Sequence, residues 1–76
     1  MDVLRNFRFL IDEKFDANDI AKDLRLQLEI NRFHDINIAA VTSRNEVIVQ
    51  VPNANGELEE SVESFMNSYQ KGVILE

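Results

Sequence analysis

The sequence predicts an α+β domain with the element order β-α-β-β-α-β, and two observations carry most of this prediction. Segment 57–71 places its apolar residues at i, i+4, i+7, i+8 and i+11, which is one stripe of a helix: Leu58, Val62, Phe65, Met66 and Tyr69. Segments 36–42 (INIAAVT) and 46–51 (EVIVQV) are instead rich in β-branched residues, and the short Ser-Arg-Asn link between them predicts a β-hairpin.

The ends of the helix predicted over 57–71 carry suitable residues. Three carboxylates, Glu57, Glu59 and Glu60, fall in its first turn, where the helix dipole favours anions. Lys71 and Gly72 close the helix, with a cation at the C-terminal end and a glycine at the expected C′ position. The preceding stretch 52–56 (PNANG) favours a loop, and the final stretch 72–76 (GVILE) favours a last strand.

Two interpretations compete for the first third of the chain. In the first, 7–12 (FRFLID) is a strand and 18–32 is a helix capped by Asp16 or Asn18. In the second, 2–14 is a helix and 23–31 (DLRLQLEIN) is a strand, which gives the order α-β-β-β-α.

The sequence favours the first interpretation. Five apolar residues then fall within about a 100° arc of one helix: Ala17, Ile20, Ala21, Leu24 and Leu28. In addition, the Leu, Arg, Gln and Glu residues of 24–29 form helices more readily than strands.

The order β-α-β-β-α-β resembles the ferredoxin-like split βαβ arrangement, a four-stranded antiparallel sheet with two helices on one face. The resemblance is one of element order alone, and this fold carries many unrelated functions. Its ligand-binding relatives use devices that this chain does not repeat. Segment 12–17 (DEKFDA) has neither the cysteine pair of metallochaperone-like domains nor the glycine-rich loop of acylphosphatase-like domains, and 46–51 has no aromatic residue of the kind that RNA-recognition domains display.

The composition argues against a disulfide-bonded, nucleic-acid-binding or membrane-spanning protein. The 76 residues predict one small domain over 1–76, and the absence of cysteine excludes disulfides and thiolate metal sites. Fourteen acidic against eight basic residues give a net charge of −6, which disfavours direct nucleic-acid binding. No apolar run is long enough to span a membrane. We therefore expect a cytoplasmic protein with no membrane association.

The chain shows no pattern of catalytic or metal-binding residues. His34 is the only histidine and has only Asp35 as an immediate carboxylate neighbour, whereas a transition-metal site needs three or four converging ligands. The serines lack the glycine context of a nucleophile elbow, and the chain has no glycine-rich phosphate loop. We expect no enzyme activity, no catalytic residues, no metal and no cofactor.

The apolar pattern predicts two candidate partner surfaces. If Phe7, Phe9 and Ile11 face the helices, then Leu10 and Ile48 form a small apolar centre on the open face of the sheet. Arg8 and Gln50 are also expected on that face, together with Ala39 and Val41 or the residues that alternate with them in 36–42.

The second candidate surface lies on the helix predicted over 18–32. Leu26, Ile30 and Phe33 fall roughly 140–200° from its core stripe. Either Ile30 and Phe33 tuck under the turn into the next strand, or the three residues form a partner surface.

These surfaces predict a small acidic protein-interaction or regulatory module that binds a protein partner and forms a homodimer. The alternative is an acidic inhibitor, or nucleic-acid mimic, that occupies a basic site on another protein. Its contacts would be the carboxylates of the last helix: Glu57, Glu59, Glu60 and Glu63.

Overall fold

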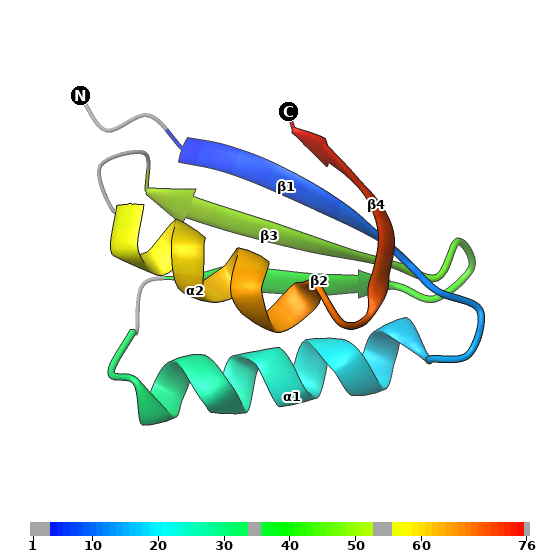
Figure 1. Cartoon of the computed structure of the whole chain (residues 1–76), viewed down its shortest axis with the longest axis horizontal. Helices are drawn as coiled ribbons and strands as arrows, with labels where there is room; N and C mark the ends of the chain where they lie inside the picture. Colours follow the sequence, from blue (N-terminus) through cyan, green and yellow to red (C-terminus); the bar gives the residue numbers. More distant parts are fainter. Residues whose placement is uncertain (1–3, 34–35, 53–55, 76) are drawn as a thin grey trace.

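A computed structural model of the chain describes residues 4–33, 36–52 and 56–75, and it confirms the order β-α-β-β-α-β (Figure 1). The elements are β1 (Leu4–Ile11), α1 (Ala17–Ile30), β2 (Asn37–Val41), β3 (Glu46–Pro52), α2 (Gly56–Met66) and β4 (Gln70–Leu75). The alternative order α-β-β-β-α is therefore wrong. Segment 4–11 is a strand, and residues 23–30, which alternate polar and apolar side chains, belong to a helix.

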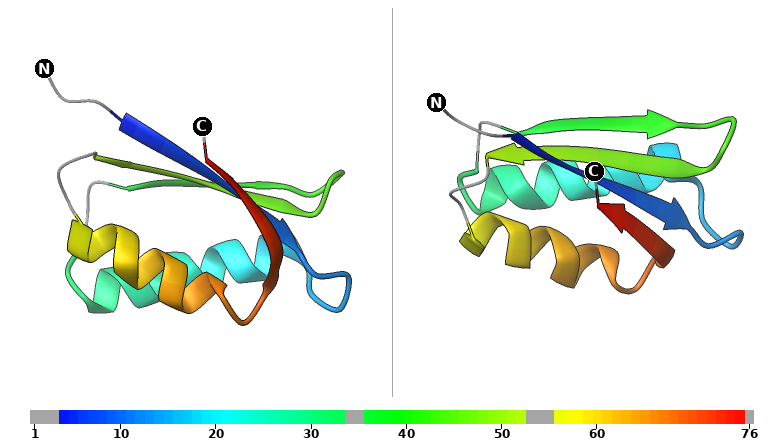
Figure 2. Two further views of the ribbon diagram at one scale, coloured as in Figure 1. Left: turned by 45° about the horizontal axis from the view of Figure 1, so that its top comes forward. Right: turned by 90° about the horizontal axis from the view of Figure 1, so that it is seen from above.

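The strands form one antiparallel sheet in the order β2-β3-β1-β4, consistent with the ferredoxin-like arrangement. Both helices lie on the same side of this sheet (Figure 2). The hydrophobic core fills the space between the two layers. Its buried side chains are Phe7, Phe9 and Ile11 of β1, Val47, Val49 and Val51 of β3, Ala17, Ile20, Ala21, Leu24 and Leu28 of α1, and Leu58, Val62 and Met66 of α2.

Helix α1 begins and ends with local capping motifs. The carboxylate of Asp16 accepts a hydrogen bond from the Asn18 backbone N–H at 3.1 Å, so Asp16 is the N-cap. At the other end Arg32 adopts a left-handed φ of 64°. The N–H groups of Arg32 and Phe33 then return to the carbonyls of Glu29 and Leu28, at 3.0 and 2.9 Å. This is a Schellman motif, which satisfies carbonyls that the helix would otherwise leave open.

Helix α2 is shorter than the sequence predicts. Leu58, Val62 and Met66 form its buried stripe as expected, but the helix ends at Met66 and residues 67–69 form a turn. The Tyr69 carbonyl accepts a hydrogen bond from the Asp12 N–H at 2.8 Å, which turns the chain toward the sheet. Gly72, expected to close the helix, lies inside β4 without a positive φ.

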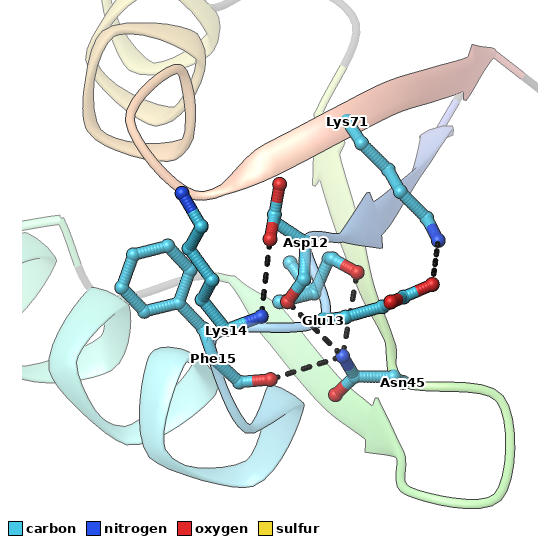
Figure 3. A network of polar contacts seen from close by, with 7 residues as sticks. Asp12, Glu13, Lys14, Phe15, Asn45 and Lys71 are labelled. Atoms are coloured by element: carbon cyan, nitrogen blue, oxygen red, sulfur yellow. Dashed lines mark hydrogen bonds and ion pairs between the residues drawn. The ribbon is translucent and has the colours of Figure 1, made fainter.

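The side chain of Asn45 joins the β2–β3 turn to the loop between β1 and α1 (Figure 3). Its Nδ2 donates to the carbonyls of Ile11, Asp12 and Phe15 at 3.3, 3.4 and 3.0 Å. Its Oδ1 accepts from the Ala17 N–H at 2.8 Å, one of the amides left open at the start of α1. Asn45 also has a φ of 52°, a left-handed conformation that asparagine tolerates better than most residues.

Candidate functional site

The outer face of the sheet, on the side away from the helices, is lined by residues from all four strands. Alternate residues of a strand point to opposite faces, so the residues between the buried core positions lie on this face. The strand register arranges them in three rows across β2, β3, β1 and β4: Asn37, Gln50 and Asn6; then Ala39, Ile48, Arg8 and Ile74; then Val41, Glu46, Leu10 and Gly72. The predicted placement of Arg8, Leu10, Ile48 and Gln50 is thereby confirmed. The choice left open for β2 is resolved, because Ala39 and Val41 lie on the outer face while Ile38 and Ala40 pack against the core.

Four residues at the middle of the outer face form a square with an apolar and a charged diagonal. Arg8 stands directly opposite Ile48, and Leu10 stands directly opposite Glu46. Leu10 and Ile48 occupy opposite corners, and neither is fully exposed. On the other diagonal Arg8 Nη1 lies 3.3 Å from Glu46 Oε1. We call these four residues the central square.

The Glu46 end of the charged diagonal is shielded from solvent, although no helix covers this face of the sheet. Glu46 is only 9% exposed, because its neighbours across the strands are Leu10 and Val41 and the Arg8 guanidinium covers its carboxylate. Diagonal pairs on adjacent antiparallel strands are within reach of long side chains, which explains the contact. Because Arg8 and Glu46 are paired with each other, neither charge is left without an opposite charge among the apolar neighbours.

A polar row borders the central square at one end. The Asn37 side-chain amide donates to Gln50 Oε1 at 3.0 Å, and Asn6 lies opposite Gln50 on the next strand. A shallow hollow of about 430 Å³ runs from this row to Arg25, with Ile48 among its lining residues. The outer face therefore has an apolar centre with an internal ion pair and an amide-rich border.

Among the outer-face residues that sequence reasoning did not assign, Ile74 and Glu46 lie nearest to the apolar centre of the face. Ile74 is 46% exposed and stands opposite Arg8, at the same level as Ile48. Its placement depends on β4 pairing with β1, which the strand order of the ferredoxin-like arrangement would have supplied. Glu46 was included in the predicted hairpin, but its polar character gave no reason to expect it beneath Arg8.

On α1 the predicted partner surface is only partly present. Leu26 and Ile30 are 58% and 66% exposed, so neither tucks under the turn. Phe33 does not join them: of the two alternatives, the one in which the side chain tucks under the turn is confirmed for Phe33 but not for Ile30. The Schellman motif takes the chain out of the helix at Arg32, and Phe33 packs against the core beside Leu28 instead.

The two predicted surfaces lie on different layers of the molecule. Leu10 and Ile48 are brought together on the outer face, whereas Leu26 and Ile30 belong to the helical layer across the sheet (Figure 2). A single flat interface cannot include both pairs. The outer face also brings further apolar residues, Ala39, Val41 and Ile74, next to the central square.

The carboxylates of α2 do not form one acidic surface. Glu59 is paired with Arg5 of β1 at 3.2 Å, and its side chain is 17% exposed. Glu57 and Glu60 instead line a groove of about 420 Å³ between the two helices. Gln27 of α1 and Asn31, the C-cap residue of α1, also line this groove. Glu63 is exposed and is not among the residues that line this groove.

No group of three or more His, Cys, Asp or Glu side chains within residues 4–33, 36–52 and 56–75 is placed to hold a metal ion. His34 and Asp35 lie outside the described residues. In the described part of the chain, neither helix has the length and apolar character needed to cross a membrane. Comparison of the chain with protein-family models, with curated proteins and with solved structures found no match.

Proposed function

We propose that this chain is a non-enzymatic protein-interaction module that associates with a second copy of itself through the outer face of its sheet. One observation carries the proposal: a four-stranded sheet with both helices on one side and Leu10, Ile48 and Ile74 grouped on the other. A sheet with one apolar-centred face outside the core commonly packs against a further layer.

The arrangement of the outer face supports an interface more than a solvated surface. Protein interfaces combine an apolar centre with a polar rim. The outer face has the apolar pair Leu10 and Ile48 and a bordering amide row, and the two charges at its centre, Arg8 and Glu46, are paired with each other. A 76-residue chain buries only about 60% of its unfolded surface on folding, so association is a physically reasonable source of extra stability.

The size of the face predicts the strength of the association. Four strands spaced about 4.8 Å apart and seven residues of β3 rising about 3.4 Å each give a face of roughly 19 by 24 Å, or about 450 Å². Two copies in contact bury on the order of 900 Å², which is at the weak end of specific interfaces. We expect a reversible dimer that dissociates on dilution.

The other expectations from the sequence remain predictions. Leu26 and Ile30 are available to a different protein partner, and an acidic inhibitor remains the alternative function. The pairing of Glu59 with Arg5 weakens that alternative, because it removes one of the four proposed contacts from the exposed acidic set. A cytoplasmic location is expected from the absence of cysteine.

The test is sedimentation equilibrium over a wide concentration range, at low and high salt, with Ile48→Glu and Ile30→Glu variants. Ile48→Glu places a charge in the central square and should abolish self-association. Ile30→Glu makes the same chemical change at an exposed position of α1 and should leave it unchanged. A wild-type chain that stays monomeric at every concentration, or a dimer lost with Ile30→Glu but kept with Ile48→Glu, would refute the proposal.

A further inference from the structure

The central square has a symmetry that decides how two copies fit together. In a face-to-face dimer the two-fold axis lies between the sheets and parallel to them, so each residue faces the mirror position across that axis. Residues on the axis meet their own copies, and residues beside it meet those on the other side. The central square has an apolar diagonal, Leu10 to Ile48, and a charged diagonal, Arg8 to Glu46.

We infer that the second copy docks about a two-fold axis along the Leu10–Ile48 diagonal, so that Arg8 of each copy pairs with Glu46 of the other. This rests on the proposed function and deepens it by specifying the partner's orientation. Leu10 then meets Leu10 of the second copy, and Ile48 meets Ile48. Four charges form one neutral cluster across the interface, with each guanidinium within reach of two carboxylates.

Charge complementarity selects this alignment over other face-to-face arrangements. An axis along the charged diagonal would press Arg8 onto Arg8 and Glu46 onto Glu46, and like charges in a desolvated interface are strongly unfavourable. An axis parallel to the strands between β1 and β3 would place each charge on an apolar residue, because Arg8 stands opposite Ile48 and Glu46 opposite Leu10. Of these three axes, the apolar diagonal alone satisfies both kinds of side chain.

The geometry agrees with known sheet packing. Neighbouring strands lie about 4.8 Å apart and alternate residues about 6.7 Å apart, so the apolar diagonal runs at roughly 35° to the strands. The strands of the two copies therefore cross at roughly 70°, closer to the orthogonal class of sheet packing at about 90° than to the aligned class at about 30°. Ile74 lies on β4, to one side of the axis, so the Ile74 side chains of the two copies are far apart in this arrangement.

The deciding experiment is a charge swap between two variants, Arg8→Glu and Glu46→Arg, measured by sedimentation velocity. Each variant alone brings like charges together across the axis and should self-associate at least about tenfold more weakly than the wild type. In an equimolar mixture, the carboxylate introduced at position 8 of one variant faces the guanidinium introduced at position 46 of the other. The native Glu46 of the first variant likewise faces the native Arg8 of the second. The mixture should recover association close to the wild-type strength.

The outcomes separate this inference from the proposed function. If both variants associate like the wild type while Ile48→Glu does not, the outer face is the interface but this alignment is wrong. If both are weakened and the mixture does not recover, the alignment is likewise wrong. If the wild type is monomeric, both proposals fall.

Chemical cross-linking gives a second test that does not depend on reversing charges, should either charge variant lose its folded circular dichroism spectrum. The chain has no cysteine, so an introduced thiol is unique. Ile48→Cys lies on the axis and should form covalent dimers with a short bismaleimide. Ile74→Cys is on the same face but off the axis and should not. The reverse result would overturn the inference.

Discussion

Asn45 offers the sharpest test of how the fold is held together. Its side chain donates to three carbonyls before α1 (Figure 3) and accepts from the Ala17 N–H at the start of that helix. The perturbation is a comparison of two variants. Asn45→Gly keeps access to the left-handed φ of 52° and removes every side-chain bond. Asn45→Asp keeps the shape and the acceptor for Ala17, but it replaces the donor by a carboxylate oxygen that faces three carbonyl oxygens.

The expected magnitudes follow from the bond lengths. The bonds at 2.8 and 3.0 Å are well formed, and those at 3.3 and 3.4 Å share a second hydrogen, which together amount to about three net hydrogen bonds. At about 1 kcal/mol each, discounted because water reaches part of the loop, Asn45→Gly should lower the free energy of unfolding by about 2 kcal/mol. Asn45→Asp should lower it by about 3 kcal/mol, because it adds repulsion to the loss.

The assay is urea unfolding followed by far-ultraviolet circular dichroism, with Asn18→Asp as the control. That control makes the same substitution at an exposed position in the first turn of α1, where a carboxylate is tolerated. A domain of 76 residues has a stability of roughly 4–11 kcal/mol, so the predicted losses are large fractions of it. If Asn45→Gly equals or exceeds the wild type in stability, Asn45 matters only for its backbone conformation and the reasoning fails.

Three further substitutions test other features of the fold by the same unfolding measurement. Arg32→Gly should raise the free energy of unfolding by about 0.5 kcal/mol, since glycine relieves the cost of a left-handed φ at the end of α1; a loss would show that the Arg32 side chain contributes more than this cost. Gly72→Ala should be stabilising by about 0.5 kcal/mol, because a Cβ there meets the Leu10 side chain at an ordinary 3.5 Å; a clear loss would contradict that spacing. Leu24→Ala should be destabilising by about 3 kcal/mol, because the side chain is fully buried between α1 and the sheet; a loss below about 1 kcal/mol would mean that the core closes around the cavity.

The sequence was sufficient to predict the element order and the two faces of the sheet. Apolar side chains of a strand alternate because only one face of the sheet is removed from water. The alternation of Phe7, Phe9 and Ile11 therefore predicted the inner face, and Leu10, which lies between two of them, was predicted on the outer face. The ambiguous alternation in 23–31 was resolved in favour of a helix. Leu26 and Ile30 lie outside the buried stripe of this helix and are therefore exposed.

The ends of the helices were less predictable, since they depend on contacts that periodicity does not contain. Tyr69 continues the apolar stripe of α2 in sequence, but it lies beyond the helix and packs edge-on against Phe15, with ring centroids 5.0 Å apart. Phe33 continues the outward stripe of α1 only if the helix persists. In both cases a tertiary contact or a capping motif ended the helix before the pattern did.

In the proposed dimer, the ion pair between Arg8 and Glu46 lets one face serve both the folded monomer and a specific association. In a single chain each charge is already satisfied by the other, so the outer face holds this pair among apolar residues without a lone buried charge. Docking about the apolar diagonal adds equivalent pairs across the interface and takes none away. Desolvation of the four charges offsets most of this added attraction, so the net gain from the charges is small and the apolar diagonal supplies most of the proposed affinity. Misaligned copies lose far more than aligned copies gain, so in the proposed dimer the charges set the orientation.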